Sequence, residues 1–129
     1  MDEKVIQHVS DATLNGTMSF PEVVGQLIST GVEYYYVDYV KAQKTFYSTT
    51  GETVETVITY QNLPTVPAAF DAKTLKAIIF DSQHNHQSYE AFTRRAMAAG
   101  VVGYFAFLSG KRVVYWGRRG ESHTELFPE

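Results

Sequence analysis

The sequence predicts an α+β fold in which one helix–helix–strand–strand unit, extended by a third strand, occurs twice. Residues 2–58 and 71–127 match at a constant offset of 69 without a gap. Each copy is shorter than the roughly 60 residues at which a lone domain becomes marginal. We therefore expect both copies to share one antiparallel sheet, with helices packed on one face and a pseudo-two-fold relating the halves. The identical pairs, mostly at capping or turn positions, are Asp2/Asp71, Lys4/Lys73, Ser19/Ser88, Gly31/Gly100, Val32/Val101, Tyr35/Tyr104, Gly51/Gly120 and Glu52/Glu121.

We expect residues 1–129 to form a single domain of two repeats, about 2–60 and 71–128. The segment between them, 61–70, contains two of the four prolines. Proline lacks a backbone N–H and suits neither a helix interior nor a central strand. This segment is therefore predicted to be the linker.

The first repeat begins with two predicted helices. Apolar residues at helical spacing cover residues 4–14, and Asn15-Gly16 supplies a suitable stop. Ser19 and Glu22 then form the capping-box pattern in front of a second amphipathic stretch. Gly31 is predicted to be the C′ residue of this second helix.

The second repeat follows the same plan. One helical stripe runs over residues 75–82, and a second follows Ser88, which stands where Ser19 caps the first repeat. Ala91 takes the place of the capping-box glutamate, and Gly100 ends the helix. We therefore expect the same two helices, the second without the glutamate of a capping box.

Segments rich in β-branched and aromatic residues follow each helix pair and predict strands. Ser109-Gly110 is predicted to be a two-residue hairpin turn. The predicted strands are Val32–Tyr39, Lys44–Ser48 and Thr53–Tyr60 in the first repeat, and Val101–Leu108, Arg112–Trp116 and Ser122–Phe127 in the second.

The strand predicted at 101–108 is apolar on both faces, whereas a half-exposed strand should alternate with polar residues. One face would carry Val101, Phe105 and Phe107, and the other Tyr104 with three aliphatic neighbours. Three explanations are open. A partner covers the second face, the face lines a pocket, or the strand is central with both faces inside.

Composition excludes several classes of protein. The 129 residues include no cysteine, so we expect neither disulfides nor thiolate chemistry. The start, Met1-Asp2-Glu3-Lys4, is acidic where a signal peptide would be basic. The longest apolar stretch, 101–108, is far shorter than the roughly 20 residues of a membrane span. We expect a cytoplasmic protein without membrane contact.

The net charge of −3 is unevenly distributed. Residues 1–60 carry three lysines and eight carboxylates, whereas residues 61–129 carry eight basic and six acidic side chains. Halves of opposite sign attract one another, within one molecule or between two copies. The acidic balance and the lack of a nucleic-acid-binding motif argue against a nucleic-acid partner.

A set of residues along the second half resembles an uncharacterised bacterial family, the YbcV-like domain of unknown function that is often labelled "phage envelope protein". The likeness covers about residues 70–128 well and the first half weakly. The resemblance implies a prophage or virion connection and no known activity. The residues that carry it are Gln83, Tyr89, Phe92, Ala99-Gly100-Val101, Tyr104, Tyr115, Gly117, Gly120-Glu121 and Glu125-Leu126-Phe127-Pro128.

The last predicted strand holds the candidate catalytic residues. Strand alternation puts Glu121, His123 and Glu125 on one face. A carboxylate beside histidine raises its pKa and can make it a general base, with Tyr115 as a candidate proton donor. The alternative is a polar edge strand whose charges discourage aggregation.

Other candidate residues carry binding hypotheses. Tyr104, Trp116 and Arg118 are the candidate ligand-binding residues, because aromatic rings beside a cation suit interfaces and stacked ligands. His84 and His86 are the candidate metal ligands. No third histidine lies near them in the sequence, so we expect neither a metal nor a cofactor.

No complete catalytic set is present, and this favours a non-enzymatic binding or interaction module. The two-sided apolar strand predicts that the module self-associates as a homodimer through an aromatic sheet face. A small hydrolase or isomerase with a site around His123 is one alternative. A prophage or virion structural component is the other. No small-molecule ligand is indicated.

Overall fold

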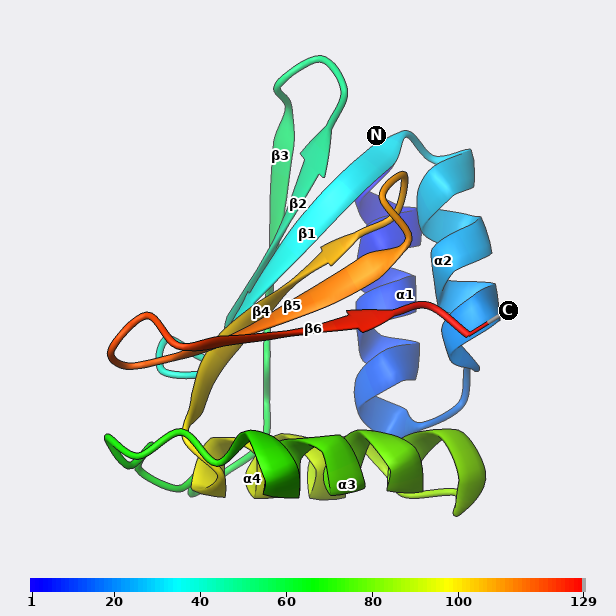
Figure 1. The fold of residues 1–129 in the computed structure, drawn as a ribbon. Helices are drawn as coiled ribbons and strands as arrows, with labels where there is room; N and C mark the ends of the chain where they lie inside the picture. Colours follow the sequence, from blue (N-terminus) through cyan, green and yellow to red (C-terminus); the bar gives the residue numbers. More distant parts are fainter. Residues whose placement is uncertain (129) are drawn as a thin grey trace.

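The computed structural model describes residues 1–128 and contains four helices and six strands (Figure 1). The predicted α+β class is confirmed. Within residues 1–128 no helix has the length and apolar character that crossing a membrane requires. In chain order the elements are α1 (Glu3–Asn15), α2 (Phe20–Ser29), β1 (Val32–Asp38), β2 (Gln43–Ser48), β3 (Thr53–Val57), α3 (Ala72–His84), α4 (Tyr89–Ala98), β4 (Val101–Phe107), β5 (Arg112–Gly117) and β6 (Ser122–Leu126).

Every element of the second half has the length of its counterpart in the first. The first helices begin at Glu3 and Ala72, so the offset is 72 − 3 = 69, and the last strands, at Thr53 and Ser122, differ by the same amount. The repeated helix–helix–strand unit is thereby confirmed. The pseudo-two-fold stays a prediction, which superposition of the two backbones tests.

The six strands form one antiparallel sheet in the order β3-β2-β1-β4-β5-β6. The repeats meet at its centre, where Tyr36 of β1 lies opposite Phe105 of β4, its counterpart at the offset of 69. Strands twist relative to one another, and the two helix pairs run in different directions as a result. In Figure 1, α1 and α2 stand beside the strands, whereas α3 and α4 run beneath them.

Burial alternates along the two central strands. Tyr35, Val37 and Ala106 are buried under the helices, whereas Tyr36 and Phe105 are half-buried on the opposite side. We call these two sides the helix face and the open face. The prediction that the helices cover one face of the sheet is confirmed.

A β-bulge near the start of each central strand shifts this alternation. The register changes between Val32 and Tyr34 in β1 and between Val101 and Gly103 in β4. Val101 is fully buried in the core and does not share the open face with Phe105. The predicted side of Val101 is therefore wrong, because the extra residue of a bulge redirects the side chains that precede it.

Side-chain caps begin the helices as predicted. The Ser19 hydroxyl accepts from the amide of Glu22 at 3.4 Å, and the Glu22 carboxylate accepts from the amide of Ser19 at 3.3 Å. Ser88 caps α4 by accepting from the amide of Ala91 at 3.0 Å, without the reciprocal bond. Gly31 follows α2 with a φ of 91°, as expected of a C′ glycine.

The predicted hairpin turn and strand ends need correction. The connection between β4 and β5 spans 108–111 instead of Ser109-Gly110 alone, and Lys111 has the positive φ, 53°. Ala42 has the same φ in the corresponding turn of the first repeat. A four-residue loop thus closes both hairpins, and the single left-handed residue fits its geometry. β3 ends at Val57, three residues earlier than predicted, and β6 ends one residue early.

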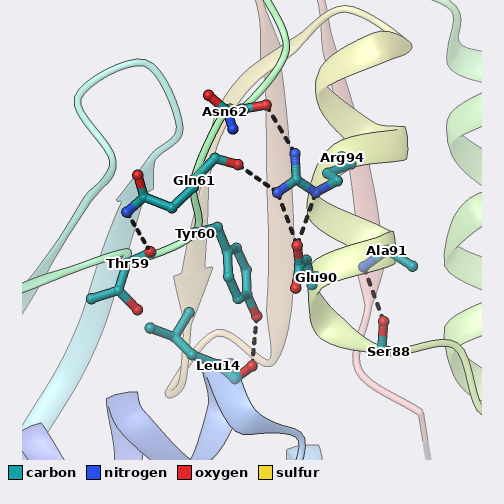
Figure 2. Close-up of polar contacts among 9 residues, drawn as sticks. All are labelled: Leu14, Thr59, Tyr60, Gln61, Asn62, Ser88, Glu90, Ala91 and Arg94. Atoms are coloured by element: carbon teal, nitrogen blue, oxygen red, sulfur yellow. Dashed lines mark hydrogen bonds and ion pairs between the residues drawn. The ribbon is translucent and has the colours of Figure 1, made fainter.

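Residues 58–71, which include the predicted linker, contain neither helix nor strand. Polar contacts hold this segment against both repeats (Figure 2). The Tyr60 hydroxyl donates to a carbonyl near the end of α1 at 2.7 Å. Arg94 of α4 donates to the carbonyls of Gln61 and Asn62 at 2.7 and 3.0 Å, so its guanidinium satisfies two exposed backbone acceptors.

Candidate functional site

The open face carries an aromatic patch. The ring of Tyr34 stacks on Tyr47 with a centroid distance of 4.6 Å, and Tyr36 packs on Phe105 at 4.5 Å. All members of the patch are half-buried, so the explanation that both faces lie inside the protein is wrong for residues 1–128. The patch comprises Tyr34, Tyr36, Tyr47, Phe105, Phe107 and Trp116.

Charged residues flank the aromatic patch asymmetrically. Asp38 and Glu55 lie on the half of the open face that the first repeat contributes, and Arg112 lies on the other half. At the outer strands, Val57 and Leu126 expose 61% and 64% of their surface. The face therefore combines an apolar centre with an acidic side and a basic side.

A second cluster, on the helix face, is made of four buried tyrosines and the half-buried Tyr89. The hydroxyls of Tyr89 and Tyr104 lie 2.6 Å apart and share a hydrogen bond. Burial raises the pKa of every member well above its usual value, because a phenolate there would lose its hydration. The cluster comprises Tyr35, Tyr39, Tyr89, Tyr104 and Tyr115.

Lys44 of β2 also points into the helix face, with only 3% of its surface exposed. Its ammonium nitrogen lies 4.6 Å from the centroid of the Tyr89 ring, within cation–π range. Among residues 1–128 no carboxylate pairs with it. Desolvation lowers the pKa of Lys44 to about 7, so a large share of this amine is neutral near physiological pH.

A cavity of about 10 Å³, the room of one water molecule, adjoins Lys44. It lies between α1, α2 and the sheet, and Ser10 and Phe46 contribute to its lining. The hydroxyls of Ser10 and Thr56 are buried 2.8 Å apart, and Thr56 is the cross-strand partner of Lys44. Lys44 and Ser10 therefore line the same water-sized space behind the sheet, and Ser10 is hydrogen-bonded to Thr56.

A larger hollow of about 390 Å³ lies between the segment that precedes α3 and the α3–α4 pair. Its polar groups are engaged within the chain. Arg95 binds Asp81 at 2.8 Å and also Gln87, and the Asp71 carboxylate caps α3 through Thr74. Few polar groups remain to orient a ligand there.

Three of the predicted catalytic residues lie together near β6. His123 Nε2 is 2.9 Å from Glu125 Oε2, and the His123 ring lies over Tyr115 with a centroid distance of 6.4 Å. The His123 side chain is 14% exposed. Glu121 is held apart, because its carboxylate accepts from the amide of Arg119 at 2.9 Å. None of the three lines either cavity described above.

The predicted ligand-binding residues do not converge. Tyr104 is buried on the helix face, whereas Trp116 lies on the open face. Arg118 donates to the carbonyl of Val66 at 3.2 Å and so contacts the segment between the repeats. These three side chains therefore cannot contact one small ligand together.

The predicted metal-ligand candidates lie on the surface. His84 ends α3 with its ring 4.2 Å from that of Phe80, and His86 is exposed in the following turn with a φ of 53°. No three His, Asp or Glu side chains within residues 1–128 are grouped so as to hold a metal ion.

Sequence reasoning missed Lys44, because a lone lysine in a strand is ordinarily solvated. A signal for it exists in the sequence. Alternation puts Lys44 on the side of the apolar Phe46, and at the offset of 69 its counterpart is Val113. Comparison of the repeats position by position would therefore have marked Lys44 as a buried lysine.

A family model described as a protein of unknown function (DUF1398) matches residues 4–129. The match spans both repeats, so it is wider than the resemblance over about 70–128. No curated protein matches the chain.

Proposed function

Because the chain belongs to the DUF1398 family, whose function is unknown, we propose a function from its surfaces: a non-enzymatic interaction module that self-associates as a homodimer through the open face. The observation that carries this proposal is the aromatic patch, which is half-buried and which no helix within residues 1–128 covers. Contiguous apolar surface of this kind is typical of an interaction site. Tyrosine, tryptophan and phenylalanine are also enriched in interface cores.

The open face is large enough for a dimer interface. Six strands of five to seven residues form it. With strands about 4.8 Å apart and a rise of about 3.3 Å per residue, the footprint is roughly 400–600 Å². One partner in a standard interface contributes about 800 Å² of accessible surface, which side chains on such a footprint approach.

The charges on the open face favour a second copy as the occupant. An isologous dimer that lays the first repeat of one copy over the second repeat of the other brings Asp38 and Glu55 to the side of Arg112. The alternative dimer, in which each repeat lies over the same repeat of the other copy, puts like charges together, which is unfavourable. The acidic residues 1–60 and the basic residues 61–129 support the same orientation.

Light scattering after size-exclusion chromatography tests this proposal. At tens of micromolar we expect twice the chain mass of 14.5 kDa. Tyr36→Glu, at the centre of the patch, should restore the monomer, because a carboxylate buried there has no counter-ion. Phe80→Glu is the matched control on α3, where Phe80 is 54% exposed, and it should remain dimeric. A wild-type mass of 14.5 kDa would contradict the proposal.

A second candidate function is a small hydrolase or isomerase centred on His123. The close contact of His123 with Glu125, beside Tyr115, favours it. In such an enzyme the histidine would act as general base. NMR of the His123 ring tests the idea, because ring chemical shifts that do not respond to Glu125→Gln would show that the two side chains do not act together and would rule it out.

The label of phage envelope protein and a cytoplasmic location remain parts of this proposal. The label comes from the sequence resemblance. A protein of the virion should be detected by mass spectrometry in purified phage particles. Absence of the protein from particles, together with its recovery from the cytosolic fraction, would contradict the phage label and support the cytoplasmic location.

A further inference from the structure

We propose that Lys44 is a Schiff-base site for an aldehyde of one or two carbons, with the Ser10–Thr56 hydroxyl pair as its proton carrier. Lys44 is 3% exposed, has no carboxylate partner among residues 1–128 and adjoins a water-sized cavity. Buried lysines of this kind carry imine chemistry, because desolvation keeps the amine neutral and nucleophilic.

The second repeat indicates that the fold does not need this polar cluster. At the offset of 69, Val113 stands in place of Lys44, and Ile79 stands in place of Ser10. Apolar residues in such places ordinarily stabilise a protein more than buried polar ones do. The first repeat therefore carries a lysine and a hydroxyl at positions that the same backbone fills with aliphatic side chains.

The cavity limits the ligand by size and charge. Its volume of about 10 Å³ admits one or two heavy atoms beyond the amine, and Leu27 and Phe46 give it apolar walls. A charged carbonyl compound would have to shed its hydration there without a counter-ion. A small neutral aldehyde fits both limits, and its imine adds only one or two carbon atoms to Lys44.

The step balances without an oxidant or reductant. The lone pair of Lys44 Nζ forms a bond to the carbonyl carbon, and the C=O π electrons move to oxygen. A proton passes from nitrogen to that oxygen and gives a carbinolamine. The C–O bond then breaks as the nitrogen pair forms C=N, and the oxygen leaves as water with the remaining nitrogen proton.

The hydroxyl pair suits the proton transfer between nitrogen and oxygen. Ser10 and Thr56 lie 2.8 Å apart, and either can be the donor in their hydrogen bond. Each hydroxyl donates one proton and accepts at its lone pairs, so the pair can take a proton on one side and deliver one on the other. At neutral pH the lowered pKa of Lys44, about 7, leaves the amine free to react.

Limited reductive labelling of the full chain tests the proposal. The protein is mixed at pH 7 with substoichiometric formaldehyde and cyanoborohydride, and peptide mass spectrometry ranks its six lysines. We expect Lys44 to be labelled at least about tenfold faster than the five exposed lysines, because an ordinary lysine is almost wholly protonated at this pH. Labelling of Lys44 at or below the rate of the others would overturn the proposal.

Three controls separate a built site from general reactivity. Lys44→Met should remove only the fast phase of labelling. Thr56→Val should slow labelling of Lys44 and leave the exposed lysines unchanged, as a proton carrier requires. Benzaldehyde, too large for the cavity, should show no preference for Lys44; an equal preference would overturn the size argument.

Because Lys44 lies on the helix face, the monomeric Tyr36→Glu variant should be labelled at Lys44 as fast as the wild type. The dimer proposal and the Schiff-base proposal can therefore fail separately.

Discussion

The two repeats share a backbone plan but differ in what they bury behind the sheet. Their helices and strands correspond residue for residue at an offset of 69. Lys44 and Tyr89 contact each other, whereas their counterparts at the offset of 69 are the apolar Val113 and Phe20. The comparison shows that helix caps, turns and strand alternation determine the backbone fold, whereas the side chains packed behind the sheet can differ between the repeats.

The largest loss of stability should appear at one of the two glycines that follow the second helix of each repeat. Gly31 and Gly100 have φ values of 91° and 99°. A Cβ on Gly100 would collide with the carbonyl oxygen of Ala69, whereas one on Gly31 meets only Met1, at 4.0 Å. Gly31→Ala should cost about 1–2 kcal/mol, the left-handed penalty alone. Gly100→Ala should cost roughly 3–5 kcal/mol, because backbone must also move.

Urea denaturation of both alanine variants measures this contrast. Equal losses of unfolding free energy would show that the segment before α3 moves aside for the Cβ at position 100 at no extra cost. That result would contradict the tight packing of Ala69 against the second repeat.

Replacement of Lys44 and of its counterpart Val113 should change stability by a similar amount and in opposite directions. Lys44→Met should raise the free energy of unfolding at pH 6 by about 3–5 kcal/mol, because a pKa lowered from 10.5 to about 7 costs 1.36 kcal/mol per unit. Val113→Lys should destabilise the protein at the same pH. A Lys44→Met variant less stable than the wild type at pH 6 would contradict the burial of an uncompensated amine.

The pH dependence of wild-type stability follows from the same group. Below about pH 7 Lys44 is charged in both states, and the cost of burying the charge is complete. Between about pH 7 and 10.5 the unfolded chain binds the extra proton, so the unfolding free energy rises with pH. Above pH 10 the buried tyrosines, whose folded pKa values are raised, reverse the slope. Denaturation across pH should find maximum stability at about pH 9–10, and Lys44→Met should flatten the rise.

Removal of the Tyr89 hydroxyl, which its counterpart Phe20 lacks, should have a smaller effect on stability. Tyr89→Phe leaves the buried Tyr104 hydroxyl without its partner at 2.6 Å, which should cost about 1–3 kcal/mol. Phe20 is 39% exposed, so Phe20→Tyr should change stability by no more than about 0.5 kcal/mol. Thermal unfolding of both variants checks the asymmetry, and a neutral Tyr89→Phe would show that the hydroxyl pair contributes nothing to the core.

The smallest difference should lie between the two helix caps. Ser19→Ala removes one half of a reciprocal capping box, whereas Ser88→Ala removes a single bond. Each should cost about 0.5–2 kcal/mol, with Ser19→Ala the more costly. Native-state hydrogen exchange at the first turns of α2 and α4 reports the two losses separately. Greater loss of protection in α4 would reverse the expected order.

Much of the fold could be predicted because its signals are local. The Ser19 capping box, the C′ Gly31 and the offset of 69 follow from hydrogen-bonding capacity and backbone freedom in short stretches. The side of Val101 could not, because bulges depend on pairing between strands. The burial of Lys44 was not predicted for a similar reason, because the residues around it come from α1 and α4, which are distant in sequence.

The candidate site was only partly predictable. Strand alternation brought His123 and Glu125 together, as they are in the structure. The grouping of Tyr104 with Trp116 rested on their aromatic character alone, and it failed because the two side chains lie on opposite faces of the sheet. The aromatic character of the open face was visible, whereas its charge asymmetry needed the register of six strands.

Fluorescence of Trp116 tests the central claim, self-association through the open face, most directly. It is the only tryptophan in the chain, and it belongs to the aromatic patch. On dilution from tens of micromolar to nanomolar, its emission should shift to longer wavelength as the second copy leaves and water reaches the ring, and the Tyr36→Glu variant should show the shifted spectrum at every concentration. An emission maximum that is independent of concentration in the wild type and equal in the variant would contradict the account.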